Sequence, residues 1–132
     1  MSRATSNVPL KVVLVEDSAL MRQLLGDVLG QLGGVEVVGG AADERSAIEL
    51  LQRQRPDLAI VDLELDSGSG LGVLRELSQN PDQFGRARAV VFSSHGHGVV
   101  RERCLALGVE RFFDKDTEME ALLAYVRQAT AS

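Results

Sequence analysis

Polar residues of three kinds stand at the ends of apolar stretches of this chain. They are the acids Glu16, Asp17 and Asp62, the hydroxyl residues Ser93 and Ser94, and the base Lys115. Three carboxylates brought close together repel one another unless a cation offsets their charge. Mg²⁺ suits a site with few carboxylates and several waters, because it is a hard ion that prefers oxygen ligands. With an ammonium and a hydroxyl nearby, these groups could carry out phosphoryl transfer.

Asp62 is the candidate nucleophile of this set. An aspartate that attacks phosphorus becomes an acyl phosphate, while a metal ion and Lys115 neutralise charge on the equatorial oxygens of the transferring group. Taken singly, each residue has a plainer interpretation, as a helix cap, a turn residue, a loop hydroxyl or a solvated surface lysine. Their joint placement at four strand ends favours the chemical interpretation.

The residues depend on a series of alternating elements for their position. Five apolar runs predict strands at residues 10–15, 35–38, 58–62, 88–92 and 109–113. Helices are predicted between and after them, with Ser18, Asp43 and Thr117 as caps and with Gly39 and Gly40 loosening the end of the second strand. This alternation favours an α/β fold, a doubly wound parallel sheet of five strands with five helices on its two faces.

The predicted sheet also explains why the polar residues should meet. In an open parallel sheet the carboxyl ends of all strands lie on one edge, and ligands bind there where the strand order reverses. We therefore expect Glu16, Asp17, Asp62, Ser93 and Lys115 to converge at this edge.

Composition narrows the class of protein. The 132 residues suffice for one domain, which we place at residues 10–130 after a flexible lead-in at residues 1–9. The net charge of −5 argues against nucleic-acid binding, which needs a basic face, and no apolar run approaches the ~18 residues of a membrane span. The single cysteine, Cys104, fits a reducing, cytoplasmic setting and is expected to be a packing residue.

Four stretches, in this order, resemble the response-regulator receiver domains of bacterial two-component signalling. They are Val13–Arg22 with its Glu16-Asp17-Ser18, Ile60–Leu63 with Gly70 eight residues after Asp62, Val91–Ser94, and Phe112–Lys115. The resemblance covers roughly residues 10–130 and implies a flavodoxin-like sheet with strand order 2-1-3-4-5.

The resemblance also implies roles for individual residues. Asp62 would accept phosphate from a histidine kinase or phosphotransfer protein, and Mg²⁺ would be held by Glu16, Asp17, Asp62 and the backbone carbonyl of Glu64. Ser93 would hydrogen-bond the phosphoryl group, and Lys115 would pair with it. Phe112 would be the aromatic switch residue. Glu64 and His95 would tune the lifetime of the phosphate. The output surface would be the fourth helix, the fifth strand and the fifth helix.

The chain departs from the family pattern at two places. Leu65-Asp66 stand where Met-Pro is usual, and Asp66 adds negative charge near the site. Lys115-Asp116 replace the usual Lys-Pro, and we expect a trans peptide there because a non-proline cis bond costs about 2.5–4 kcal/mol. His95 and His97 could be interpreted as zinc ligands. We do not expect a zinc site there, because the two histidines lack the cysteine or carboxylate partners of such a site.

Three functions remain to be weighed. The first is a phosphorylatable switch, not itself an enzyme acting on other substrates, that signals to an unidentified partner protein, either alone or as the N-terminal receiver of a longer regulator. The output face could also support a weak homodimer. The second is a receiver-like scaffold that works without phosphate. The third is a dehalogenase-like hydrolase, which the position of Asp62 after the third strand disfavours.

Overall fold

The computed structural model describes residues 8–94 and 98–131. His95 and His97 and most of the predicted lead-in lie outside these residues. The elements in chain order are β1 (Leu10–Val15), α2 (Ala19–Gly30), β2 (Val35–Ala41), α3 (Glu44–Gln54), β3 (Leu58–Val61), α4 (Gly70–Gln79), η1 (Pro81–Phe84), β4 (Arg88–Ser93), α5 (Val99–Ala106), β5 (Arg111–Asp114) and α6 (Met119–Ala131).

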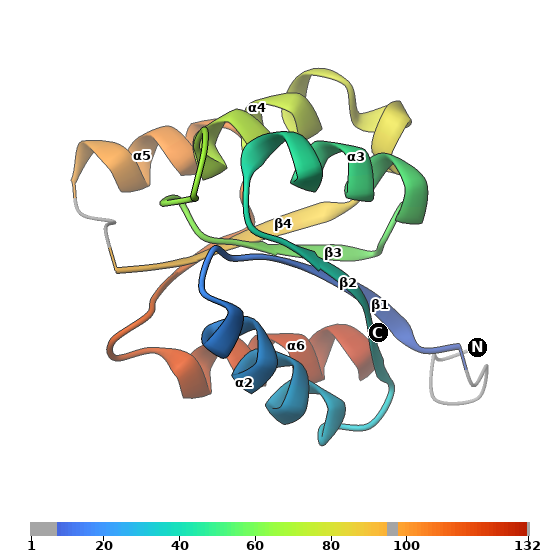
Figure 1. The fold of residues 1–132 in the computed structure, drawn as a ribbon. Helices are drawn as coiled ribbons and strands as arrows, with labels where there is room; N and C mark the ends of the chain where they lie inside the picture. Colours follow the sequence, from blue (N-terminus) through green and yellow to red (C-terminus); the bar gives the residue numbers. More distant parts are fainter. Residues whose placement is uncertain (1–7, 95–97, 132) are drawn as a thin grey trace.

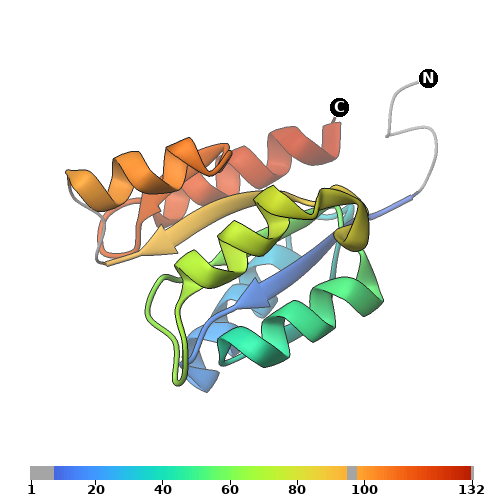
Figure 2. The same cartoon turned by 90° about the horizontal axis from the view of Figure 1, so that it is seen from above.

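The five strands form one parallel sheet in the order β2-β1-β3-β4-β5. Helices α3, α4 and α5 cover one face of the sheet, and α2 and α6 cover the other (Figure 1). Seen from above, α3, α4 and α5 follow one another across their face (Figure 2). The predicted doubly wound α/β fold and its strand order are therefore confirmed.

Each central strand contributes to two separate cores, because alternate residues of a strand point to opposite faces. In β3, Ala59 and Val61 pack under α3, α4 and α5, whereas Leu58 and Ile60 pack against α2 and α6. All four residues are buried, which explains why this strand reads as a continuous apolar run in the sequence.

Two of the predicted helix caps are in place. The hydroxyl of Ser18 accepts a hydrogen bond from the amide of Met21 at 3.1 Å, and Asp43 accepts one from the amide of Ser46 at 2.8 Å. The predicted cap at Thr117 is wrong by one residue. The last helix, α6, starts at Met119, and the carbonyl of the residue before it, Glu118, accepts the first helical hydrogen bond from Leu122 at 3.0 Å.

The second strand is longer than predicted. Instead of ending before Gly39 and Gly40, β2 runs through both to Ala41, with a register shift opposite Val12 and Val13. A Cβ at Gly39 would lie 3.0 Å from Leu50, and one at Gly40 would lie 3.0 Å from Arg22. The glycines therefore serve the close approach of two helices to an edge strand rather than its termination.

Two further features bear on the expectations from composition. Cys104 of α5 is buried with 0% of its surface exposed, as expected of a packing residue. Among the described residues, no helix has the length and apolar character needed to cross a bilayer.

Candidate functional site

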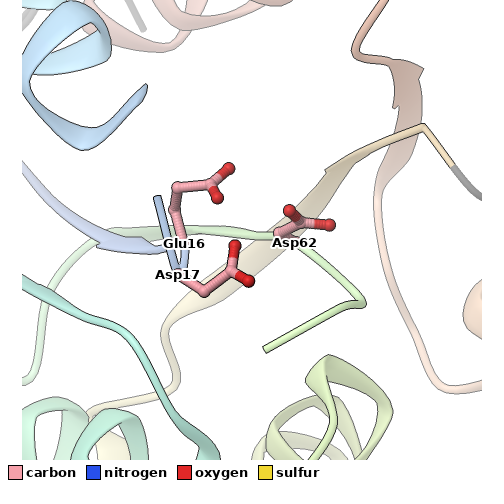
Figure 3. Close-up of side chains that lie close together, drawn as sticks. All are labelled: Glu16, Asp17 and Asp62. Atoms are coloured by element: carbon pink, nitrogen blue, oxygen red, sulfur yellow. The ribbon is translucent and has the colours of Figure 1, made fainter. Parts of the chain in front are cut away.

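Three carboxylates gather at the carboxyl edge of the sheet. Glu16 and Asp17 follow β1, and Asp62 follows the neighbouring strand β3. Figure 3 shows the three side chains close together at this edge, and one oxygen of each lies within 4.8 Å of the others. Glu16 is 3% exposed and Asp62 is 5% exposed, so two of the three charges are held away from bulk water.

Lys115, which follows β5, supplies a positive charge to this cluster. Its Nζ donates hydrogen bonds to Glu16 Oε1 and to Asp62 Oδ2, both at 2.6 Å. Burial by itself lowers the pKa of Lys115, but the hydrogen bonds and charges of Asp62 and Glu16 outweigh it and raise the pKa above its usual value. The lysine is therefore held in its charged form.

The cluster keeps an excess of negative charge. Burial raises the pKa of Glu16, and the opposing hydrogen bonds from Lys115 and from the amide of Ser18 offset only part of this rise. One ammonium faces three carboxylates, so a second cation is needed to balance them. Oxygen ligands from Glu16, Asp17 and Asp62 make a donor set that fits a hard divalent ion.

Backbone contacts fix where the acidic residues lie. The amide of Asp62 donates to the carbonyl of Val15 at 2.8 Å, and Asp62 Oδ1 accepts from the amide of Glu64 at 3.3 Å. Gly70 lies so close that a Cβ there would be 2.1 Å from the carbonyl oxygen of Asp62. These contacts connect β1, β3 and the start of α4 directly at the site.

Arg22 has a positioning role that the sequence did not reveal. Its guanidinium donates to the carbonyl of Glu16 at 2.5 Å, beside the space that Gly40 leaves open. The available signal was its place one turn after the cap Ser18, since helical side chains lean toward the N-terminus of their helix. In the sequence, Arg22 was noted only as the last residue of the family-like stretch Val13–Arg22.

Ser93 and Phe112 lie on adjacent strands next to Lys115. Ser93 ends β4 with 0% of its surface exposed, and its carbonyl accepts from the amide of Lys115 at 3.1 Å. Phe112 of β5 is 4% exposed, and the guanidinium of Arg101 in α5 lies 5.6 Å from its ring centroid.

The two departures from the family pattern have simple local structures. The side chain of Asp66 is exposed, and the peptide between Lys115 and Asp116 is trans, as expected. The hydroxyl of Ser94 donates to Asp116 Oδ1 at 3.4 Å, which links the ends of β4 and β5. Glu64 is exposed, whereas His95 lies outside the described residues.

Similar proteins were found at the level of sequence. The protein-glutamate methylesterase/protein-glutamine glutaminase 2 of Koribacter versatilis (strain Ellin345) is 32% identical over 116 residues, which cover 86% of this chain and 31% of that protein. A homologous methylesterase of Myxococcus xanthus (strain DK1622) is 35% identical over 137 residues, covering 94% of this chain and 38% of that protein. The chain thus spans only about a fifth to two fifths of the length of the curated relatives it matches.

Solved structures of receiver domains have the same fold as this chain. The response regulator domain of Thermotoga maritima CheB superposes with a TM-score of 0.80 at 25% identity, covering 92% of this chain and 96% of that one. The receiver domain of Klebsiella pneumoniae RstA gives a TM-score of 0.78 at 26% identity, covering 92% and 99%. The family model of the response regulator receiver domain matches residues 12–127, most of the chain, and the chain therefore belongs to that family.

Proposed function

We propose that this receiver domain is a phosphorylation switch in which Asp62 accepts a phosphoryl group. The observation that carries the proposal is the placement of Asp62, which is buried, bonded to Lys115 at 2.6 Å and clustered with Glu16 and Asp17. A carboxylate needs such surroundings to face an incoming phosphoryl group, because that group adds further negative charge.

The donor in this proposal is a phosphohistidine of a histidine kinase or phosphotransfer protein. A carboxylate oxygen of Asp62 forms a bond to phosphorus while the bond from phosphorus to the imidazole nitrogen breaks, leaving an acyl phosphate and a free histidine. Lys115 would shift its hydrogen bond from Asp62 to a phosphoryl oxygen, and the hydroxyl of Ser93 would bond another.

Mg²⁺ is the cofactor that fits the donor set. Glu16, Asp17 and Asp62 would hold it, together with the backbone carbonyl of Glu64. When bound, it supplies neutralisation of charge on the transferring phosphoryl group. Glu64, two residues after Asp62, and His95, two residues after Ser93 in the sequence, would govern how long the acyl phosphate survives hydrolysis.

The signal in this proposal leaves the site through β4 and β5. A phosphoryl group that recruits Ser93 would change the packing around Phe112, which lies under α5 in the register next to Val91. The face made by α5, β5 and α6 would then bind a partner protein differently. The switch acts through such a partner rather than as an enzyme on other substrates, and the role holds for a receiver alone or within a longer regulator.

The test is phosphorylation by a small-molecule acyl phosphate, with and without Mg²⁺, followed by intact mass. We expect one added phosphoryl group that requires Mg²⁺ and is lost in Asp62→Asn. Asp66→Asn is the matched control, because it removes an exposed carboxylate from the same loop and should leave the modification intact. No modification of the wild type, or modification that survives Asp62→Asn, would contradict the proposal.

A further inference from the structure

The loop of residues 62–69, between β3 and α4, is tied to a segment that lies some 25 residues earlier in the chain. The amide of Asp66 donates to the carbonyl of Ala42 at 3.1 Å, and the amide of Glu44 donates to the carbonyl of Ser67 at 3.0 Å. The third bond uses a side chain: the amide of Ser69 donates to Glu44 Oε1 at 2.9 Å. Glu44 therefore holds the loop through both its backbone and its carboxylate.

Two glycines make the space in which the Glu44 side chain lies. A Cβ at Gly68 would be 2.5 Å from the Cβ of Glu44, and a Cβ at Gly72 would be 2.4 Å from its carboxyl carbon. Gly68 has a φ of +77°, a conformation that other residues rarely adopt. Any side chain at position 72 would push the carboxylate away from Ser69.

The charge of Glu44 suits this place. Glu44 is the first residue of α3, and Ser69, which it binds, is the N-cap of α4. The carboxylate thus lies at the N-termini of two helices, where the helix dipoles and unpaired amides favour a negative charge. The bond from Ser69 to Glu44 is a charge-assisted hydrogen bond in a half-buried setting.

We propose that Glu44 is a positioning residue for the phosphoacceptor loop. By fixing residues 66–69, it sets where Asp62 and the backbone of Glu64 lie relative to Glu16, Asp17 and Lys115. The loop needs such an anchor because Leu65-Asp66 stand in it without a proline to restrict the backbone. The positional effect stands on the structure alone, and its consequence for phosphoryl transfer rests on the function proposed above.

Amide hydrogen exchange of the metal-free protein tests the positional effect directly. In Glu44→Ala we expect exchange at Ser69 and Asp66 to rise on the order of tenfold, the size expected for losing one hydrogen bond to a charged group, while β1 and β3 keep their protection. Glu44→Gln keeps an acceptor oxygen and should restore most of the protection. Glu49→Ala is the matched control. Glu49 is exposed on the same helix and lines, with Glu44, one surface pocket beside the loop, but it makes no bond to the loop. Unchanged loop exchange in Glu44→Ala would overturn the inference.

Gly72→Ala provides a second test. It should loosen the loop if the Glu44 carboxylate holds it, and should stabilise α4 if that carboxylate plays no part. Alanine is normally favoured over glycine in a helix, so the substitution should stabilise α4 unless the Glu44 carboxylate is displaced. We expect Gly72→Ala to speed loop exchange as Glu44→Ala does, and to add no further acceleration in the double mutant. Full additivity of the two substitutions would count against the inference.

Phosphorylation kinetics then separate a positioning role from a merely structural contact. At saturating acyl phosphate and Mg²⁺, we expect the rate for Glu44→Ala to fall roughly tenfold, with Glu44→Gln and Glu49→Ala close to the wild type. A wild-type rate in Glu44→Ala despite faster loop exchange would refute the positioning role. If the wild type itself accepts no phosphate, the function proposed above fails, while the exchange experiment still decides whether Glu44 holds the loop.

Discussion

At the scale of single residues, the charge balance of the site depends on Lys115. Its side chain is 17% exposed and contacts two carboxylate side chains that are 4% and 7% exposed. Buried carboxylates that lose their partner are left with repulsion and without solvation. The lysine thus stabilises the folded site and would also serve the proposed chemistry.

Lys115→Met should lower the free energy of unfolding of the metal-free protein by about 3–5 kcal/mol, the range for breaking a buried ion pair from one side. Urea denaturation measures it. Added Mg²⁺ should recover part of the loss, because a cation that binds only the folded state stabilises it. The control is Lys11→Met, which alters an exposed lysine and should change stability by less than about 0.5 kcal/mol. Equal effects of the two substitutions would argue against this account.

Tyr125 provides a prediction for alkaline pH. Burial, followed by its hydrogen bond to Glu110, raises the pKa of Tyr125 to about 12. An unfolded tyrosine titrates near pH 10, about its ordinary value. Between these values the folded protein holds one more proton than the unfolded protein, so stability is fully present below about pH 10 and falls as the pH rises toward 12.

The titration can be followed by tyrosinate absorbance, because the chain has one tyrosine and no tryptophan. We expect a native midpoint near 12 and a lower midpoint in Glu110→Gln, which keeps an acceptor but removes the charge. A native midpoint at the ordinary value, or one unmoved by Glu110→Gln, would show that these surroundings do not control the phenol.

At the scale of elements, the junction of β3 and α4 depends on a close backbone approach. Gly70 starts α4, and a Cβ there would lie 2.1 Å from the carbonyl oxygen of Asp62. A backbone oxygen cannot rotate away as a flexible side chain could. Any larger residue would therefore move the helix or the end of β3, which carries Asp62.

Gly70→Ala should lower the free energy of unfolding by about 1–3 kcal/mol or more, as other overpacked sites do. Gly26→Ala is the matched control within α2, where nothing lies within 4 Å of the added Cβ. That substitution should raise stability by up to about 1 kcal/mol, because alanine has the higher helix propensity. Chemical denaturation of both variants measures these free energies of unfolding. If both substitutions raise stability, or both lower it, the steric account is contradicted.

At the scale of the whole molecule, the parallel sheet separates two apolar cores. Cys104 belongs to the core under α3, α4 and α5, together with Phe112 and Val109. It is 0% exposed, and burial raises the pKa of its thiol. The thiol is thus shielded and protonated, so it reports on opening of this core.

Alkylation of Cys104 in the native protein should be slower than in the unfolded chain by on the order of 10³-fold or more, since reaction requires opening of the core. Denaturant below the unfolding midpoint should accelerate it in step with the loss of stability. Mass spectrometry follows the reaction, and the chain has no second cysteine to confuse the signal. A native rate near that of the unfolded chain would mean that α5 opens freely.

The sequence by itself determined the local features of this protein. The apolar runs located the strands, Ser18 and Asp43 were placed correctly as caps, and the acidic residues at two strand ends marked the site. These features depend on neighbours within one or two turns of chain, so periodicity and residue type suffice to predict them. The strand order was available only through resemblance to a family, since local patterns do not choose partners in a sheet.

Tertiary structure decided which particular side chains from distant parts of the chain contact one another. Lys115 lies 99 residues from Glu16 and 53 from Asp62; strand ends in the sequence predicted that they meet at one edge, but only the folded structure shows that Lys115 bonds these two carboxylates. Gly39 and Gly40 looked like strand breakers, yet they remain in β2 because Leu50 and Arg22 need the space. Glu44 looked like an ordinary first residue of a helix, and its bond to Ser69 depends on Gly68 of the following loop and Gly72 of α4. Such contacts are set by packing in three dimensions, which no local sequence pattern encodes.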